Sequence, residues 1–302
     1  MNTNPKNEIH LKIFTQNLWG VPRSSPNIRE RFKKFFQNLD HIGADVYTLQ
    51  ETFHEKITQE EIIIPWREKS PHFARVNKTS LLKFKFVGSG LTTLSHLKIV
   101  RQEFHFFSKS RSFDKLANKG SLLTTVRTNN GIEIDIYNTH FQAYYHRSPK
   151  AISRVRKHQI EELKTWIQGH SPSDRNILIT GDLNFEEDTE NYFELITTCK
   201  KEDPSGSCPR FAGHPSDTNP FQQNQDFKFF DIKRELFPNK VTHPFQTIKH
   251  RNPKRRRRLD YILLRPAKGW VWDKDKSHAE VLDLGVSDHS GVLGEFVLKK
   301  IL

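Results

Sequence analysis

Short apolar runs of four to seven residues recur along the whole chain, and they constrain the fold more than any other feature. Runs of this length are typical of β-strands. The predicted strands are Leu11–Thr15, Val46–Leu49, Gly90–Ser95, Ser121–Arg127, Ile132–Asn138, Asn176–Thr180, Tyr261–Leu264 and Val292–Leu298. So many strands bury their apolar faces naturally when two sheets pack together.

Two longer segments, Ile28–Leu39 and Ser153–Gln168, carry apolar residues at spacings of three and four, which predicts α-helices. The chain is therefore expected to be a mixed α and β protein. Apolar residues, including 23 Phe, are spread over the whole length, and no long Gly/Ser/Pro linker divides it. We expect residues 1–302 to form a single domain that acts as a monomer.

The sequence contains no run of about 18 apolar residues and no apparent signal region at its N-terminus. We therefore expect a soluble protein, either cytoplasmic or exported by a route that reads other features. Cys199 and Cys208 are the only cysteines, and a disulfide or two free thiols explain them equally well. Neither cysteine has a second ligand at the spacing of a zinc site.

Basic residues outnumber acidic residues by 48 to 35, which gives a net charge of +13. Such a surface attracts polyanions, and nucleic acid, anionic lipid and inositol phosphates all qualify. The densest basic run is His250–Arg258, immediately before Asp260. It is either a solvated loop or a segment that attracts substrate.

Polar residues stand at the ends of several predicted strands. Asn17 follows the first strand, Glu51 and His140 end two others, and Asp182 and Asn184 follow the strand Asn176–Thr180. Taken singly, each is as well explained as a turn or cap residue. Sheet-based folds build sites at such strand ends, because the rigid sheet positions the side chains beside open loops.

Six short motifs occur in a fixed order, each beside a predicted strand. They are TQNLWG (15–20), LQE (49–51), NTH (138–140), GDLN (181–184), RLDY (258–261) and SDH (287–289). This ordered set resembles the endonuclease/exonuclease/phosphatase superfamily, which includes deoxyribonucleases, abasic-site endonucleases, inositol polyphosphate 5-phosphatases and neutral sphingomyelinases. The resemblance runs from residue 13 to about residue 297.

The resemblance implies an α+β fold, a four-layer α/β/β/α sandwich of two mixed β-sheets, with a Mg²⁺ site at one edge. It also implies the following roles: Asn17 and Glu51 hold Mg²⁺, and Asp288 completes the metal environment; Asp182 and Asn184 position the attacking water and the phosphate; His140 contacts the phosphate or the leaving group; His289 is the acid/base residue, oriented by Asp260.

These roles agree with the chemistry of phosphate esters. A hard cation held by carboxylate and amide oxygens neutralises charge on the phosphate, so Mg²⁺ fits the residues better than zinc, with Mn²⁺ or Co²⁺ as substitutes. A histidine moves protons near neutral pH, and a carboxylate behind it fixes its tautomer and stabilises its charged form.

Four segments resemble the neutral sphingomyelinase branch: NLWGVP (17–22), GSGL (88–91), NKG (118–120) and THFQA (139–143). Within the third, Lys119 either approaches the substrate phosphate or is a surface lysine. The branch implies Mg²⁺-dependent hydrolysis of sphingomyelin to ceramide and phosphocholine, so we expect a phospholipid substrate and peripheral contact with a membrane surface. Trp270 and Trp272 either provide this contact or pack in the core.

Alternative functions remain open. A nuclease acting on DNA or RNA fits the net charge and the arginine run but not the branch motifs. A phosphoinositide phosphatase lacks support because the Trp-Cys-Asp-Arg element of that branch is absent before the last motifs. A catalytically inactive protein that binds a phosphorylated ligand or a lipid surface is disfavoured because every expected catalytic position is filled.

Overall fold

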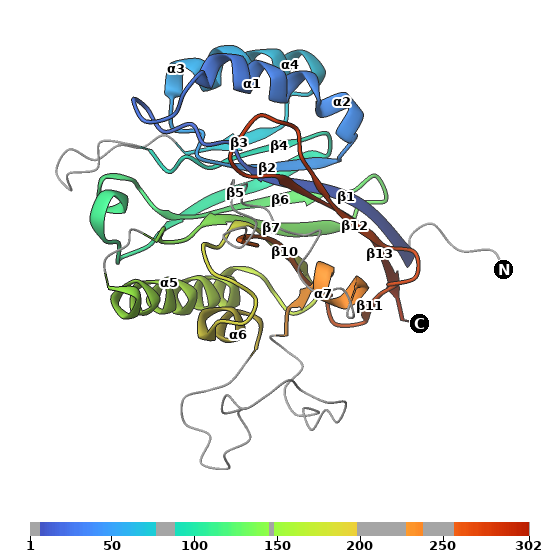
Figure 1. The fold of residues 1–302 in the computed structure, drawn as a ribbon. Helices are drawn as coiled ribbons and strands as arrows, with labels where there is room; N and C mark the ends of the chain where they lie inside the picture. The colour runs from blue at the N-terminus through green and yellow to red at the C-terminus, as the bar shows by residue number, and fades with distance from the viewer. Residues whose placement is uncertain (1–6, 77–87, 145–147, 198–227, 238–256, 302) are drawn as a thin grey trace.

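Two β-sheets pack face to face at the centre of the molecule, and helices lie outside them (Figure 1). The computed structural model describes residues 7–76, 88–144, 148–197, 228–237 and 257–301. The layers run helix, sheet, sheet, helix, which confirms the predicted α+β class and the sandwich. None of the helices in these ranges is both long and apolar enough to cross a membrane.

The first sheet is mixed, because β1 and β2 are parallel and the other neighbouring strands are antiparallel. Its spatial order is β11 (Trp270–Trp272), β13 (Gly291–Lys300), β1 (Glu8–Asn17), β2 (Val46–Gln50), β4 (Thr92–Ser95) and β3 (Phe73–Arg75), with β12 (His278–Leu282) also paired with β13.

The second sheet is also mixed, with β7 and β8 as its parallel pair. Its spatial order is β5 (Lys98–Phe106), β6 (Gly120–Arg127), β7 (Glu133–His140), β8 (Asn176–Asp182), β10 (Asp260–Arg265) and β9 (Phe230–Asp231). Every strand predicted from the apolar runs is present at its expected place in one of the two sheets.

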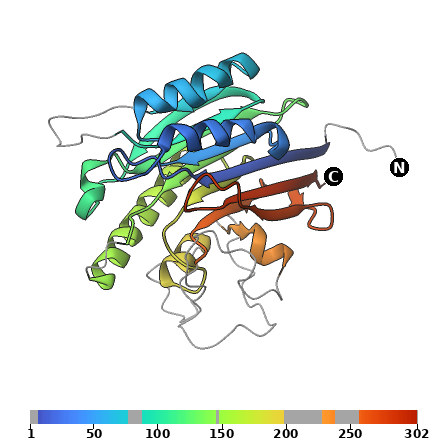
Figure 2. The same ribbon diagram turned by 45° about the horizontal axis from the view of Figure 1, so that its top comes forward.

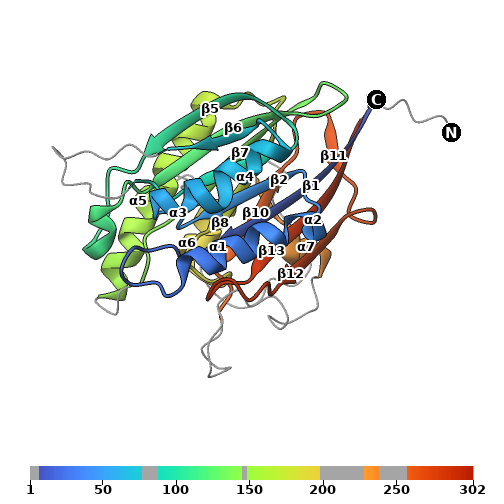
Figure 3. The ribbon, with the colours of Figure 1, turned by 90° about the horizontal axis from the view of Figure 1, so that it is seen from above.

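Helices from separate parts of the chain cover the two sheets. Over the first sheet lie α1 (Ile28–Gln37), α2 (Leu39–Ile42), α3 (Glu55–Thr58), the π-helical turn η2 (Gln59–Ile63) and α4 (Ile64–Lys69), as Figures 2 and 3 show. Against the second sheet lie α5 (Pro149–His170) and α6 (Glu190–Ile196); α7 (Ile232–Leu236) packs beside β10 and β12. A 3₁₀ turn, η4 (Ser112–Leu116), precedes β6. Both predicted helices are therefore confirmed, although the first divides into α1 and α2 at Asn38.

The core follows from the alternation of side chains along the strands. In β1, Ile9, Leu11 and Ile13 belong to the apolar cluster between the sheets, whereas Phe14 belongs to the cluster beneath α1 and α4. Toward the end of β1 the interior becomes polar, and the buried Gln50 donates to Asn138 Oδ1 across the sheets at 2.8 Å. This polar end of the sandwich is where the strand-end residues gather.

The structure supports the core interpretation of Trp270 and Trp272. Trp272 is only 7% exposed, packs against Phe230 and Phe296, and donates its ring N–H to Ser277 Oγ at 2.8 Å. Trp270 is half-buried against the same cluster. The side chain of Trp272 therefore faces inward, because burial of its large ring between apolar neighbours is favourable. The two cysteines lie outside the described residues.

Candidate active site

Six strand ends bring the predicted site residues to one edge of the sandwich. Asp182, the last residue of β8, is paired with both His140 on β7 and Asp260 on β10. In the facing sheet, Asn17 ends β1 opposite Gln50, and Glu51 follows directly. His289 lies two residues before β13. The strand register within each sheet and the packing of the two sheets thus bring together residues that are far apart in the sequence.

Unusual backbone conformations shape the strand ends. Gly181 has φ 130°, and a Cβ at this position would lie 2.0 Å from the carbonyl oxygen of Thr139, so only glycine allows β7 and β8 to approach here. Glu51 and Asn184 adopt the left-handed region at φ 55° and 56°. This region is sparsely populated by residues other than glycine, and such conformations cluster at functional sites.

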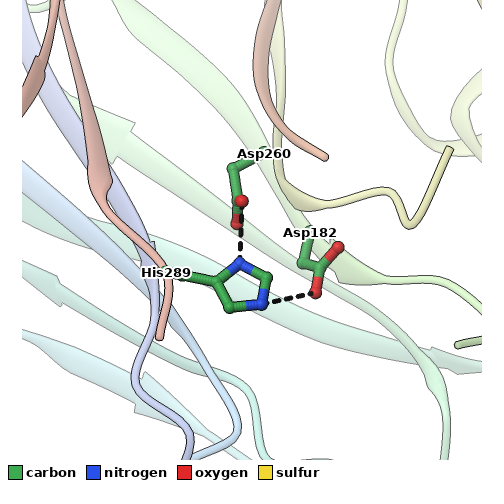
Figure 4. Close-up of side chains that lie close together, drawn as sticks. All are labelled: Asp182, Asp260 and His289. Atoms are coloured by element: carbon green, nitrogen blue, oxygen red, sulfur yellow. Dashed lines mark hydrogen bonds and ion pairs between the residues drawn. The ribbon is translucent and has the colours of Figure 1, made fainter. Parts of the chain in front are cut away.

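His289 is held between two buried carboxylates, as Figure 4 shows. Its Nδ1 lies 2.8 Å from Asp260 Oδ2, and its Nε2 lies 3.8 Å from Asp182 Oδ2. Burial opposes protonation of His289, but the attraction of Asp260 and Asp182 outweighs it and raises the pKa of the ring to about 10. Asp260 therefore fixes the Nδ1–H tautomer and leaves Nε2 facing Asp182.

Burial raises the pKa of the Asp182 carboxyl above its ordinary value, and repulsion by Asp260 adds to this, while His289 and Asn17 act in the opposite direction. Asp182 Oδ1 accepts from the backbone N–H of Asn184 at 2.9 Å, so the GDLN turn is closed by its own aspartate. The side-chain Nδ2 of Asn184 donates to the carbonyl oxygen of Phe141 at 3.2 Å.

The amide of Asn17 bridges the carboxylates of two strands. Its Nδ2 donates to Glu51 Oε1 and to Asp182 Oδ2, each at 3.0 Å, while its Oδ1 accepts from the backbone N–H of Trp19 at 2.9 Å. In this arrangement Asn17 presents nitrogen to the carboxylates. Direct ligation of a cation by its oxygen requires the amide to turn over.

Glu51 offers the clearest sign of a cation site. Its Oε2 is buried without a hydrogen-bond partner among the described residues, and burial raises the pKa of the carboxyl despite the hydrogen bond from Asn17 and the attraction of Lys119. A buried, unmatched carboxylate oxygen is costly unless a cation or a further donor completes it. Such a hard oxygen donor fits Mg²⁺.

A second group could also hold a metal, because one ligand atom from each of Asp182, Asp260 and His289 lies within 4.8 Å of the others. His289 Nδ1, however, is already hydrogen-bonded to Asp260, and a histidine paired with a carboxylate in this way is typical of residues that transfer protons. Asp182 belongs to this group and also shares the Asn17 amide with Glu51, so its carboxylate could bind a cation at either position.

His140 and Lys119 are two further buried residues of the site. His140 Nε2 lies 3.5 Å from Asp182 Oδ2 and 4.0 Å from Glu51 Oε1. Burial, together with the positive charges of Lys119 and His289, holds the pKa of His140 well below its ordinary value, so its ring is neutral. Lys119 is only 3% exposed and donates to the Phe141 carbonyl at 3.3 Å, so it is not an ordinary surface lysine.

Asp288 lies at the margin of the site. It is half-buried and accepts from Ser287 Oγ at 3.2 Å. Its charge acts to raise the pKa of both Glu51 and His289. The structure therefore gathers all eight predicted catalytic and metal residues, together with Lys119, at this one edge.

Two positioning residues were not identified from the sequence. The Gln16 side chain is buried and donates to the carbonyl oxygen of His289 at 2.9 Å. The Arg31 guanidinium donates to the carbonyl oxygens of Leu18, Trp19 and Val286 at 2.8 to 2.9 Å, tying the loop after β1 to the loop before His289. Gln16 belongs to the TQNLWG motif, but Arg31 carries no local signal.

Only the last two residues of the basic run, Arg257 and Arg258, are described, and Arg258 does not belong to a solvated loop. Arg258 is 5% exposed, pairs with Asp231 through both guanidinium nitrogens at 2.6 and 2.8 Å, and stacks on Tyr261. It is a buried structural ion pair, because attraction and hydrogen bonds from Asp231 compensate its burial. Arg257 lies 3.6 Å from Glu186, and residues 250–256 lie outside the described ranges.

Comparison with known proteins gives consistent matches. The chain is 28% identical over 187 residues to Sphingomyelinase C of Listeria ivanovii, a match that covers 58% of this chain and 55% of that protein, so the chain spans about half the length of this relative. Its fold is similar to that of a beta toxin from Staphylococcus aureus with bound magnesium ions, with a TM-score of 0.63 at 19% identity, covering 95% of this chain and 99% of the toxin.

The fold is equally similar to that of D. rerio TDP2 complexed with a single-strand DNA product, with a TM-score of 0.63 at 18% identity, covering 95% of this chain and 98% of that chain. At these identities the two structures support the fold alone. A family-wide comparison matches residues 14–289, nearly the whole chain, to the Endonuclease/Exonuclease/phosphatase family. The chain therefore belongs to the Endonuclease/Exonuclease/phosphatase family.

Proposed function

We propose that this chain is a Mg²⁺-dependent phosphodiester hydrolase of the phospholipase C type, which cleaves sphingomyelin to ceramide and phosphocholine. The observation that carries the hydrolase proposal is the buried row Asp260–His289–Asp182 beside the unmatched carboxylate oxygen of Glu51. The substrate is supported by the similarity to a sphingomyelinase and by the four branch motifs.

In this proposal His289 is the general base. Its Nε2 takes the proton of a water positioned by Asp182 and Asn184, while Asp260 holds Nδ1–H and stabilises the imidazolium that forms. The proton later passes to the leaving ceramide oxygen, either from His289 or through water. This role requires neutral His289, whereas the attraction of Asp260 and Asp182 outweighs burial and raises the pKa of the ring to about 10.

Glu51 would hold Mg²⁺, with Asp182 and Asn17 beside it and Asp288 as a further candidate ligand. When bound, the cation would neutralise charge on the phosphate oxygens and lower the pKa of nearby acids. His140 is neutral and would donate a hydrogen bond to the phosphate or the leaving group, and Lys119 would supply positive charge beneath it.

The test is phosphocholine release from sphingomyelin vesicles, measured with Mg²⁺ and with excess chelator. The parent protein is compared with His289→Ala and with His278→Ala, a matched control whose histidine is exposed on β12. We expect Mg²⁺-dependent release in the parent and the control, and loss of release in His289→Ala. Release that persists in His289→Ala or in chelator contradicts the proposal.

A nuclease is the second candidate, favoured by the net charge of +13 and by the fold shared with TDP2. Nicking of plasmid DNA under the same conditions, without phosphocholine release, would select it. Lack of both activities, with Mg²⁺-independent binding of vesicles, would leave the inactive binding protein.

A further inference from the structure

The loop between β5 and β6 carries several exposed side chains, some apolar and some basic. Phe106 and Leu116 are 45% and 43% exposed, and they are among the few large apolar side chains that are exposed in the described ranges. Lys109, Arg111 and Lys115 lie between them in the sequence and are exposed. We call these five residues the docking rim.

The loop is fixed to the segments that carry the site. Its ends meet, because the backbone N–H of Phe107 donates to the carbonyl oxygen of Lys119 at 3.0 Å. Its inner side is anchored by the N–H of Ala143, which donates to Asp114 Oδ2 at 2.8 Å, and by the N–H of Arg111, which donates to Gln142 Oε1 at 2.7 Å. These contacts place the loop beside the chain that follows His140.

The views of the whole molecule agree with this placement. Figures 1 and 3 show η4, the loop that follows β1 and the start of α5 at the same end of the two sheets. This is the end at which Asn17 and Asp182 terminate their strands. The docking rim therefore lies at the same end of the molecule as the candidate active site.

The outward charge of the loop has one sign. Asp114 is the only acidic residue between Phe107 and Lys119, and it is 6% exposed and turned inward. The exposed charges are therefore all positive. Exposed apolar side chains mixed with lysine and arginine are typical of surfaces that bind anionic membranes, because the apolar groups enter the interface and the cations pair with lipid charge. A nucleic acid duplex would explain the charges but not the exposure of the aliphatic Leu116.

We propose that the docking rim binds an anionic phospholipid surface and thereby holds this end of the molecule against the lipid headgroups. The inference rests on the proposed function for its lipid substrate, but the contact itself is independent of turnover. It assigns the membrane contact to the loop between β5 and β6, on a different part of the molecule from β11, where Trp270 and Trp272 are packed.

Binding is measured by co-sedimentation with vesicles of phosphatidylcholine, with and without phosphatidylserine, in chelator and without sphingomyelin. Phe106→Ser with Leu116→Ser tests the apolar part. Ile64→Ser with Val271→Ser is its matched control, since these residues are 51% and 48% exposed elsewhere. Thermal unfolding checks that each variant is folded.

A second set tests the charge. Lys109→Gln with Lys115→Gln is compared with Lys33→Gln with Lys268→Gln, which removes the same charge from lysines exposed elsewhere. This set remains a test if the apolar variant unfolds.

We expect each rim pair to lower binding to phosphatidylserine vesicles by about tenfold or more, and each control pair to stay within about twofold of the parent. Equal losses in rim and control pairs, unchanged binding in the rim pairs, or equal parent binding with and without phosphatidylserine would overturn the proposal. Loss of duplex DNA binding with vesicle binding intact would assign the rim to nucleic acid. Because the vesicles contain no sphingomyelin, the binding result can be interpreted even if the protein does not hydrolyse sphingomyelin.

Discussion

Replacing Asp260 with asparagine isolates the electrostatic part of the proposed mechanism. Asp260 is fully buried, and its Oδ2 lies 2.8 Å from His289 Nδ1, so asparagine keeps the volume and removes the charge. At about 4 Å from the centre of the imidazolium, that charge contributes about 4 kcal/mol at an effective dielectric constant of about 20. If this stabilisation is lost as His289 takes its proton, kcat falls by about 10³-fold.

The substitution has a second signature. Without the charge of Asp260 the pKa of His289 should fall. Burial lowers this pKa, and Asp182 then remains as the main charge that raises it. NMR titration of the His289 ring measures this change, and hydrolysis of sphingomyelin measures kcat. Asp275→Asn, in an exposed loop, is the control. A loss in kcat within about threefold, in a folded variant whose His289 pKa has fallen, would refute the proposed role of Asp260.

Three further predictions follow from the geometry. Gln16→Leu should lower kcat roughly tenfold with KM unchanged, since it removes the donor to the His289 carbonyl; a raised KM with unchanged kcat would contradict a positioning role. Mg²⁺ should raise the melting temperature of the parent but not of Glu51→Gln, with Glu235→Gln as the control, and an equal rise in all three would argue against Glu51 as a ligand. Acid should destabilise the fold through Asp231: burial alone would raise its pKa, but Arg258 holds it below the ordinary value, so its contribution is present above about pH 4 and lost as the pH falls through the folded value. Urea unfolding at neutral and acidic pH measures this, and an unchanged free energy of unfolding would contradict it.

The strands and the site residues could both be predicted from the sequence, because both depend on the pattern of apolar runs. Strands buried on both faces, such as β8, appear as continuous apolar runs, and polar residues at their ends are conspicuous. β5 was missed because it is an edge strand whose residues are mostly half-buried, so charged side chains interrupt its apolar pattern.

Contacts between segments that are far apart in the sequence could not be predicted from it. Gln16 reaches His289 across 273 positions, and Arg31 joins two loops by side-chain hydrogen bonds that depend on the packed fold. Arg258 looked like part of a solvated run because its partner, Asp231, lies 27 positions earlier. Local composition cannot show whether a charge is buried and paired, since pairing is decided by tertiary structure.

The central claim is that the converged strand ends act as one hydrolytic unit, and a double-mutant cycle on sphingomyelin hydrolysis tests it most directly. His289→Ala, Asp182→Ala and the double variant are assayed with Mg²⁺ beside the parent, with folding checked by thermal unfolding. Residues that serve one step give non-additive losses, so we expect each single variant to lose nearly as much kcat as the double variant. Losses that multiply in the double variant, or full activity in either single variant, would contradict the account.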